Sequence, residues 1–373
     1  MDNSLWPDWL PLREDLADLK PYGAPQIGDV IALNTNENPY PLPLEVQRAI
    51  SKEIESVLAN LNRYPDRDAI SLREKLTEYI NQLHGTSHSF KNIWVANGSN
   101  EILQTIALAF GGAGRKAIGF TPSYSMHPLI ARITGTQWIS FNRANDFALD
   151  LSAALAQIKE AKPSLIFITT PNNPSGSATP LSHINALAQA AKENKAILVV
   201  DEAYEEFSPE ESAVTLIEEF PQLVVSRTMS KAFAFAGARV GYLVANPNVV
   251  DALSLTRLPY HLSALTQAAA AVAIDHAPLL QSGLKSLISE RTRVSEALGE
   301  LGWICEPSQA NFLLFSGFAG LPSDVWQKFL DKGILIRDIG LTVGDRKYLR
   351  VTVGTPEENE AFLQAAREIA SRS

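Results

Sequence analysis

Cysteine is almost absent from this chain of 373 residues, where Cys305 is the only one. A single cysteine excludes an intrachain disulfide framework and suits a reducing compartment such as the cytosol. The sequence also lacks any run of about 18 uninterrupted apolar residues, which a membrane-spanning helix needs. Its N-terminus has neither the basic start nor the apolar core of a secretion signal. We therefore expect a cytoplasmic protein that does not enter membranes.

Positive charge is in the minority, with 32 Lys and Arg residues against 41 Asp and Glu residues and a formal net charge of -9. Neither nucleic-acid phosphates nor anionic lipids attract such a surface, which argues against both as partners. The hydrophobic content of 46% is ordinary for a globular protein with a substantial core. The length predicts one large domain or two unequal ones.

Proline and aromatic residues crowd residues 1–42, in WPDWLPL, KPYGAPQ and NENPYPLPLE. Proline fixes φ and removes a hydrogen-bond donor, so this segment is predicted to be an extended arm that lies on another surface. Residues 263–373 begin with a long helical region, 264–300, and then mix strands with helices. They indicate a small α+β domain packed with the arm.

Residues 43–262 alternate short apolar runs with amphipathic stretches, a pattern that indicates an α/β domain with a mostly parallel sheet. The connection between Thr228 and Arg239 is short for a helical crossover. It therefore predicts that the strand after it runs antiparallel. The predicted strands are 93–97, 116–120, 165–170, 196–204, 223–228 and 239–246.

Polar residues collect where four of these strands end, in NGSNE (97–101), PNNPSG (171–176), DEAY (201–204) and RTMSK (227–231). In open α/β sheets, ligands bind beyond the carboxyl ends of the strands. Each segment alone is explained by a helix cap or a turn. Four of them on one sheet edge, one bearing Lys231, favour a binding site.

The residue types at this edge suit one kind of chemistry. A lysine amine attacks an aldehyde when its neighbours lower its pKa, and a carboxylate can keep a pyridine nitrogen protonated. Asparagine and tyrosine can bind a phenolic oxygen, while hydroxyls, arginine and helix N-terminal amides hold a phosphate. These requirements together describe pyridoxal 5′-phosphate.

The same segments resemble a known family. NPSG, DEAYEEF and SRTMSKAFAFAGARVGY are similar to signatures of the fold-type I pyridoxal-phosphate-dependent aminotransferases. The resemblance narrows to the histidinol-phosphate aminotransferases through LNTNENPYPLP, NRYPDRD, ANGSNEIL, PSYSMHP, TRLPYHLSALTQAA, GILIRD and YLRVTVG. It implies a large domain (43–262) with a mostly parallel seven-stranded sheet sandwiched by helices, a small α+β domain (263–373) and an N-terminal arm (1–42).

The resemblance also implies a role for each matching residue. Lys231 would attach the cofactor and then act as general base and acid, and Asp201 would pair with the pyridine nitrogen. Tyr204 and Asn173 would bond the ring 3-oxygen, and Tyr124 would stack on the ring. The cofactor phosphate would be held by Ser99, Asn100, Thr228, Ser230, Arg239 and the partner subunit's Tyr64, which makes the implied enzyme a homodimer with shared active sites.

For the substrates, Arg350 is similar to the arginine that takes an α-carboxylate, and Arg337 to the group that assists with a substrate phosphate. Tyr22 and Tyr260 match positions at the imidazole and phosphate end, and Asn36 lies in a matching segment. The implied reaction is a ping-pong transamination between histidinol phosphate and 2-oxoglutarate, giving imidazole-acetol phosphate and glutamate, in histidine biosynthesis.

Three departures from the family pattern are small: Ser175 where threonine is common, Ala234 where glycine is frequent, and His127 where an aromatic residue often follows. None removes a catalytic group, and His127 is predicted to pack or to line the rim. His84 and His88, in HGTSH, are predicted to lie in a polar loop, and no metal site is expected.

Other functions compete with this one. An aromatic aminotransferase or a phosphothreonine decarboxylase would use a similar pocket. A regulatory module that binds the cofactor without turnover would not need Lys231, Asp201, Tyr204 and Arg350 together. A dinucleotide site is excluded, because the glycines of GGAGR (111–115) follow a predicted helix and precede a strand, the reverse of the required order.

Overall fold

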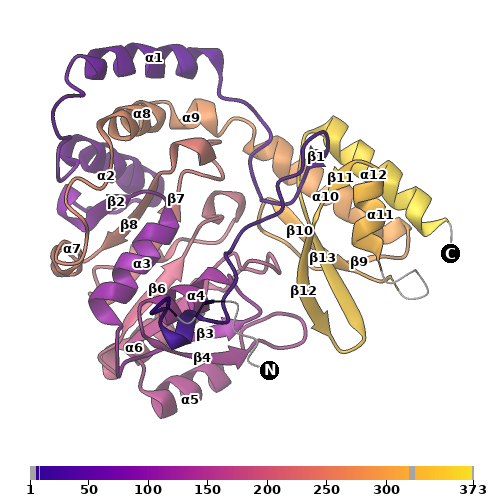
Figure 1. Ribbon diagram of the computed structural model, residues 1–373, viewed down its shortest axis with the longest axis horizontal. Coiled ribbons are helices and arrows are strands. Elements are labelled where there is room, and N and C mark those ends of the chain that lie inside the picture. Colours follow the sequence, from indigo (N-terminus) through magenta and orange to yellow (C-terminus); the bar gives the residue numbers. More distant parts are fainter. Residues whose placement is uncertain (1–5, 8, 319–323, 372–373) are drawn as a thin grey trace.

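The computed structural model describes residues 6–7, 9–318 and 324–371. Residues 1–5 and 8 of the expected arm, and 319–323 and 372–373 of the expected small domain, lie outside the described residues. Figure 1 shows a large domain and a smaller one side by side, with the N-terminal segment running between them. In the described ranges, no helix is long and apolar enough to cross a membrane.

The large domain is built on a seven-stranded sheet with the order β2-β8-β7-β6-β5-β3-β4. Its neighbours pair in parallel except β8, which is antiparallel to β2 and β7. The strands are β2 (Ile93–Ala96), β3 (Lys116–Thr121), β4 (Gln137–Asn142), β5 (Leu165–Thr169), β6 (Ile197–Asp201), β7 (Leu223–Thr228) and β8 (Gly241–Ala245). The mostly parallel sheet, its six predicted strands and the antiparallel direction of the last one are confirmed.

The strand that the apolar pattern does not predict is β4, at the edge of the sheet. Its sequence, QWISFN, has no apolar run, and its residues are only half-buried or exposed. An edge strand with partial cover needs few apolar residues, so its sequence resembles a loop.

Helices cover both faces of the large sheet, as the sandwich prediction requires (Figure 1). Alternate residues of β6 show this arrangement: Leu198 and Val200 belong to one hydrophobic cluster, and Val199 to another on the opposite face. The helices around the sheet are α1 (Leu44–Leu58), α2 (Ile70–His84), α3 (Ser99–Phe110), α4 (Met126–Ile133), α5 (Leu151–Ala161), α6 (Leu181–Glu193), α7 (Pro247–Leu253), α8 (Ala264–Asp275) and α9 (Ala277–Leu280). Short 3₁₀ turns lie at η2 (Phe90–Asn92), η3 (Glu205–Phe207), η4 (Ala213–Leu216) and η5 (Ala236–Ala238).

The small domain has a four-stranded antiparallel sheet with the order β12-β13-β10-β9. Leu313, Phe315 and Val351 on one face of this sheet pack against its helices. The strands are β9 (Ile304–Cys305), β10 (Phe312–Ser316), β12 (Arg337–Val343) and β13 (Arg346–Thr352), and the helices are α10 (Leu284–Glu300), α11 (Val325–Asp331) and α12 (Pro356–Ala370). The other face of the sheet contacts the large domain, where Leu314 and Tyr348 pack with Phe147.

The helical region predicted over 264–300 is three helices rather than one, α8, α9 and α10. Pro278 lies in the first turn of α9, where a proline starts a helix but cannot continue one, and Gly283 precedes α10. α8 packs against α1 and α2 of the large domain, whereas α10 packs on the small sheet. The boundaries at 42/43 and 262/263 stay predictions.

The N-terminal arm is irregular apart from the single turn η1 (Glu14–Leu16) and the two-residue strand β1 (Ile31–Ala32), as predicted. β1 pairs in parallel with β11 (Ile334–Leu335) of the small domain. Near its start, the arm lies on α4 of its own chain: Arg132 pairs with Asp18, and Arg13 donates to the Ile133 carbonyl at 3.0 Å. The arm thus contacts both domains.

A buried network of charged side chains surrounds Arg227, a residue of β7. Arg227 donates to Glu202 at 2.8 Å and pairs with Glu205 at 3.1 Å, and its Nη2 lies 3.0 Å from His84 Nε2. His84 ends α2, so the prediction of a polar loop is wrong for it. His88 lies in the irregular segment after α2, as predicted, with its side chain buried. In the described part of the chain, no group of three or more His, Cys, Asp and Glu residues could hold a metal ion.

Candidate active site

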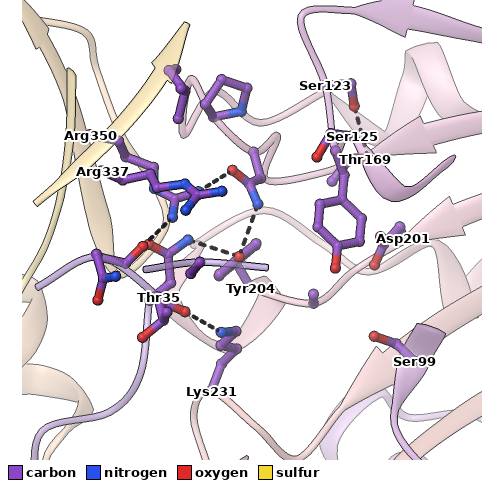
Figure 2. Close-up of a pocket in the computed structure, with 18 of the residues that line it drawn as sticks. Thr35, Ser99, Ser123, Ser125, Thr169, Asp201, Tyr204, Lys231, Arg337 and Arg350 are labelled. Atoms are coloured by element: carbon purple, nitrogen blue, oxygen red, sulfur yellow. Dashed lines mark hydrogen bonds between the residues drawn. The ribbon is translucent and has the colours of Figure 1, made fainter. Parts of the chain in front are cut away.

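A cavity of about 460 Å³ lies where the carboxyl ends of β5, β6 and β7 meet the first turn of α3. The small-domain strands β12 and β13 contribute another wall, and the arm contributes residues between Tyr22 and Asn36 (Figure 2). The sequence-predicted residues that line it are Tyr22, Asn36, Ser99, Asn100, Tyr124, Asn173, Asp201, Tyr204, Thr228, Ser230, Lys231, Arg239, Arg337 and Arg350. Strand ends far apart in the sequence therefore meet in one site.

Lys231 lies in the loop after β7, facing the cavity. Its Nζ donates to the Thr35 carbonyl at 3.0 Å and lies 5.9 Å from the centre of the Tyr204 ring (Figure 2). Burial, and then the positive charge of Arg350, lower the pKa of Lys231 to about 7, against the opposing effect of Glu37. A neutral and nucleophilic amine is thus abundant near neutral pH.

This pKa predicts the pH at which the amine of the apoprotein becomes reactive. We expect labelling of Lys231 by a small acylating reagent to reach half its maximal rate near pH 7, because the amine loses its proton there. Ordinary exposed lysines, with a pKa of about 10.4, provide the internal reference. Mass spectrometry of the digested protein measures both, and a midpoint at pH 9 or above for Lys231 would contradict the expectation.

The same shift has a consequence for stability. Between the folded pKa of about 7 and the ordinary value of 10.5, the unfolded chain binds a proton at Lys231 that the folded chain does not. The stability of the apoprotein therefore gains from this group as pH rises through that window.

Hydroxyl groups and an arginine converge beside the start of α3. Thr228 Oγ1 donates to Ser230 Oγ at 3.0 Å, and Arg239 Nη1 donates to the same oxygen at 3.4 Å. α3 begins at Ser99, and the first N–H groups of a helix have no partner within it. Cationic, hydroxyl and amide donors around one point form an anion site.

Two glycines allow these parts to approach closely. A Cβ added to Gly98 would lie 2.6 Å from Arg239 Nη2, and one added to Gly241 would lie 2.4 Å from the backbone nitrogen of Ser99. Gly98 also has a φ of 83°, a backbone conformation that residues with a side chain rarely adopt. A larger residue at either position would displace Arg239 or the start of α3 and so disturb the anion site.

Asp201 ends β6 and is buried at the cavity floor. Its Oδ2 lies 3.2 Å from His127 Nε2, whereas Oδ1 is buried without a hydrogen-bond partner among the described residues. His127 stacks on Phe167, with 4.9 Å between ring centres, and meets Tyr124 edge-on at 5.5 Å. The packing predicted for His127 is present, but the contact with Asp201 is one that the sequence analysis missed.

A polar chain links Tyr204 to Arg350. The Tyr204 hydroxyl accepts from Asn36 at 3.0 Å and from Asn173 at 3.4 Å. Arg350 donates from Nη1 to Asn173 Oδ1 at 2.7 Å and from Nη2 to the Asn34 carbonyl at 2.9 Å. Burial lowers the pKa of Arg350 and raises the pKa of Tyr204. Within the described residues Arg350 Nε is buried without a partner, so one donor of the guanidinium is left for a ligand.

Arg337 and Arg350 are direct partners across β12 and β13, and their side chains lie together on the small-domain wall (Figure 2). The charge of Arg337 adds to the effect of burial in lowering the pKa of Arg350. Two guanidinium groups side by side can bind a carboxylate or a phosphate.

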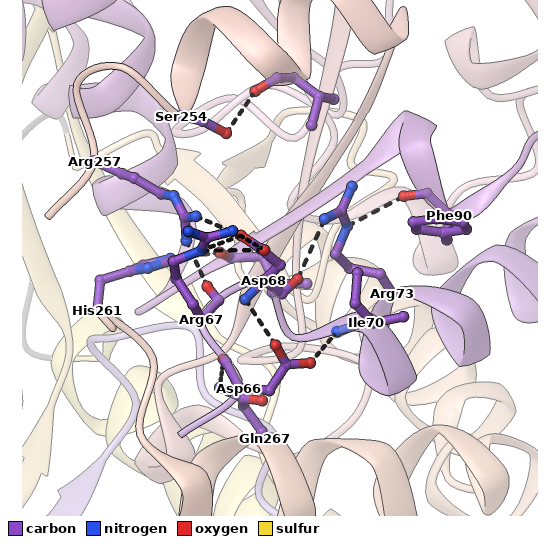
Figure 3. Close-up of polar contacts among 12 residues, drawn as sticks. Asp66, Arg67, Asp68, Ile70, Arg73, Phe90, Ser254, Arg257, His261 and Gln267 are labelled. Carbon is purple, nitrogen blue, oxygen red and sulfur yellow. Dashed lines mark hydrogen bonds and ion pairs between the residues drawn. The ribbon is translucent and has the colours of Figure 1, made fainter. Parts of the chain in front are cut away.

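Tyr64 and Tyr260 are the two candidate residues that do not line this cavity. Their rings stack with centres 4.4 Å apart, and Tyr64 is 79% exposed. The segments that carry them are fastened together: Arg257 pairs with Asp68 and donates to the Arg67 carbonyl, both at 2.5 Å (Figure 3). The pair is therefore a fixed feature of the outer surface.

The site contains groups that sequence reasoning missed. The carbonyls of Asn34 and Thr35 hold Arg350 and Lys231, and a carbonyl carries no sequence signal, because every residue has one. The residues 338–341 of β12 also line the cavity, beside Arg337. Their position depends on the irregular register between β12 and β13.

Comparison with known proteins agrees with this geometry. The family model for aminotransferase class I and II matches residues 28–365. The histidinol-phosphate aminotransferases of Mycobacterium sp. (strain JLS) and Mycobacterium marinum are each 51% identical to this chain, covering 96% and 98% of it and 94% of each relative. The crystal structure of histidinol-phosphate aminotransferase from Sinorhizobium meliloti, in complex with pyridoxal 5′-phosphate, superposes with a TM-score of 0.82 at 25% identity and covers 91% of both chains.

Proposed function

The chain belongs to the aminotransferase class I and II family, and from this premise we propose that it is a histidinol-phosphate aminotransferase of histidine biosynthesis. It would exchange an amino group between histidinol phosphate and 2-oxoglutarate, giving imidazole-acetol phosphate and glutamate. Identity of 51% over almost the whole length of relatives with this activity supports the substrate.

One observation carries the proposal: a single cavity joins Lys231, whose pKa lies near 7, to the two guanidinium groups of Arg337 and Arg350. A reactive amine suits amino-group transfer. The two cations suit substrates that carry a phosphate in one half of the reaction and two carboxylates in the other.

The cofactor is pyridoxal 5′-phosphate, and the residues present fit it. The buried Asp201 Oδ1 lacks a partner among the described residues, as expected of an oxygen that would hold a pyridine N–H. The anion cradle of Thr228, Ser230, Arg239 and the α3 amides would hold the phosphate. When bound, the cofactor supplies an aldehyde that combines with amines and a ring that accepts the electron pair released from Cα.

Each of the cavity residues would then have a separate role. Lys231 would bind the cofactor, be released by the incoming amine and move the Cα proton, for which its lowered pKa is suited. Asp201 would keep the ring nitrogen protonated, and His127 at 3.2 Å would fix the carboxylate. Asn173 and Tyr204 would hold the ring oxygen, and Tyr124 would cover the ring. These roles stay predictions.

The substrates would share the small-domain wall. Arg350 has an available buried Nε among the described residues and would take the α-carboxylate of glutamate. Histidinol phosphate lacks that carboxylate and carries a phosphate, for which Arg337 lies alongside. Tyr22 lines the cavity from the arm and would cover the bound substrate.

Substrate competition tests this proposal. We expect kcat/KM for histidinol phosphate, with 2-oxoglutarate as acceptor, to exceed that for phenylalanine by more than about tenfold, because only the phosphate engages a second arginine. A preference for phenylalanine would instead identify an aromatic aminotransferase. Release of CO₂ from phosphothreonine would identify a decarboxylase.

We also propose that the enzyme is a homodimer in which Tyr64 completes the partner subunit's site. The exposed Tyr64–Tyr260 stack is fixed but lies outside its own cavity, which supports a role in another copy. Exposed apolar residues in the same segments are Leu58, Leu61, Leu255 and Leu258.

Mixed dimers test the shared site. Lys231→Ala and Tyr64→Ala chains, each inactive or weak alone, should regain activity when mixed, because one site of the mixed dimer then has both an intact lysine and an intact tyrosine. Sedimentation velocity checks the dimer itself. A monomer, or mixtures without recovered activity, would contradict the proposal.

The cytoplasmic location also stays a prediction, supported by the single cysteine. Recovery of the activity in a membrane or secreted fraction of the source cells would contradict it.

A further inference from the structure

Strand β12 departs from regular pairing where it borders the cavity. Asp338 is the partner of Leu349 and Thr342 is the partner of Lys347, so residues 339–341 of β12 lie opposite Tyr348 alone. Such a bulge bends the strand and moves the extra residues out of line. Gly340, in its middle, has a φ of 64°, a conformation that favours glycine.

One side chain closes the bulge. Asp338 accepts the Gly340 N–H with Oδ1 at 2.8 Å and pairs through Oδ2 with Lys347, across the hairpin, at 2.8 Å. The carboxylate thus ties the first residue of the irregular stretch to its middle and to the neighbouring strand. It determines where residues 339–341 lie.

The bulge brings aliphatic side chains to the site. Ile339 and Leu341 line the cavity, and in its described lining they are the only Val, Leu, Ile or Met residues. They also pack on the small cluster of Phe147, Leu314 and Tyr348, in which the Phe147 and Tyr348 rings meet edge-on at 5.4 Å. This backing makes them a supported wall rather than a loose loop.

The two amino donors of the proposed reaction differ in their need for such a wall. Glutamate ends in a carboxylate, which binds arginine favourably but gains no binding free energy from contact with an aliphatic surface. Histidinol phosphate carries a flat imidazole ring, whose faces and carbon edges gain when water is removed from them. Arg337, next to the bulge in sequence, lies on the same wall of the cavity.

We propose that the β12 bulge is the specificity wall of this enzyme: Ile339 and Leu341 contact the ring of the ring-bearing amino donor, and Asp338 is the positioning residue that holds them there. The inference rests on the proposed function for the identity of that donor. It assigns selection between the two half-reactions to three neighbouring residues of one strand.

The test compares each half-reaction in Ile339→Ala, Leu341→Ala and the matched control Val343→Ala. Val343 packs on the same cluster but does not line the cavity. We expect the ratio of kcat/KM for histidinol phosphate to that for glutamate to fall about tenfold in the first two variants and to be unchanged in the control. In a Lys231→Ala background, where turnover stops, calorimetric binding of histidinol phosphate should weaken by a similar factor.

Asp338 variants test the positioning role. Asp338→Asn keeps an oxygen for the Gly340 N–H but loses the charge pair with Lys347, whereas Asp338→Ala loses both. We expect the ratio of kcat/KM for histidinol phosphate to that for glutamate to fall in Asp338→Ala, because KM for histidinol phosphate rises. The ratio should be largely restored in Asp338→Asn. A purely structural role would instead lower both half-reactions together.

The outcomes separate this inference from the proposed function. Equal losses of kcat/KM for both donors in Ile339→Ala and Leu341→Ala would overturn the proposed wall. A fall of the kcat/KM ratio in Val343→Ala as large as in those two variants would overturn it as well. If the unaltered enzyme does not act on histidinol phosphate, the proposed function fails, and the ratio of phenylalanine to glutamate tests the wall in its place. A fall of that ratio in Leu341→Ala would support the wall, and an unchanged ratio would overturn it.

Discussion

Lys231→Ala should lower kcat with histidinol phosphate and 2-oxoglutarate by about 10⁴-fold or more, the upper range for loss of a group that transfers a proton. The amine faces the cavity and has a pKa of about 7, so it is available both for attachment and for proton transfer. The nearby Tyr204 hydroxyl cannot replace it easily, because burial raises the pKa of Tyr204 and two asparagines already bond its oxygen.

Two measurements check this expectation. Steady-state kinetics gives kcat, and the visible absorbance of the purified protein, yellow in the unaltered enzyme, reports attachment to the lysine. Lys75→Ala is the matched control, since Lys75 pairs with Asp275 on the outer surface, away from the cavity. Full activity of a folded Lys231→Ala protein would remove the basis of the aminotransferase assignment for this site.

The edge of the large sheet was the part of the site most accessible to sequence reasoning. Asp201 and Lys231 each follow an apolar run, and parallel strands bring their carboxyl ends to one edge whatever the details of packing. The two residues are 30 positions apart in the sequence, yet the direction of their strands alone predicts that they meet.

Contacts that depend on how helices and side chains pack cannot be predicted from the direction of the strands. His127 reaches Asp201 from α4, 74 residues away, and an aromatic residue would fill the same space, so the pattern indicates only packing. Ala234 is a backbone example: its φ is 52°, a conformation that favours glycine, and the residue type alone does not reveal that conformation.

The pairing of the two small-domain arginines is a further contact of this kind. If the register of Thr342 with Lys347 continued as a regular hairpin, Ile339 would lie opposite Arg350, and it is the bulge that makes Arg337 the partner of Arg350. The bulge between Asp338 and Thr342 depends on one side-chain contact to a backbone N–H, which competes with the regular ladder. Apolar periodicity cannot reveal such a register shift, because it only reports which face a residue occupies when pairing is regular.

Arg350→Gln should have the second-largest effect, lowering kcat/KM for glutamate by about 10²- to 10³-fold, as expected when one partner of a buried charge pair is removed. Arg350 is buried, and its Nε has no partner among the described residues, whereas its other donors are fixed by Asn173 and the Asn34 carbonyl. A planar guanidinium held in this way is ready to accept a carboxylate without rearrangement.

The loss should be smaller for histidinol phosphate, because Arg337 remains beside the vacant position and can hold the phosphate. Glutamine can still donate to Asn173, so the link between the two domains survives in part and the variant should fold. Arg346→Gln is the matched control, an exposed arginine of the same strand outside the cavity lining. Separate half-reaction kinetics for the two donors decide the matter: an equal loss for both would mean that Arg350 binds no particular group of glutamate and acts through the domain contact instead.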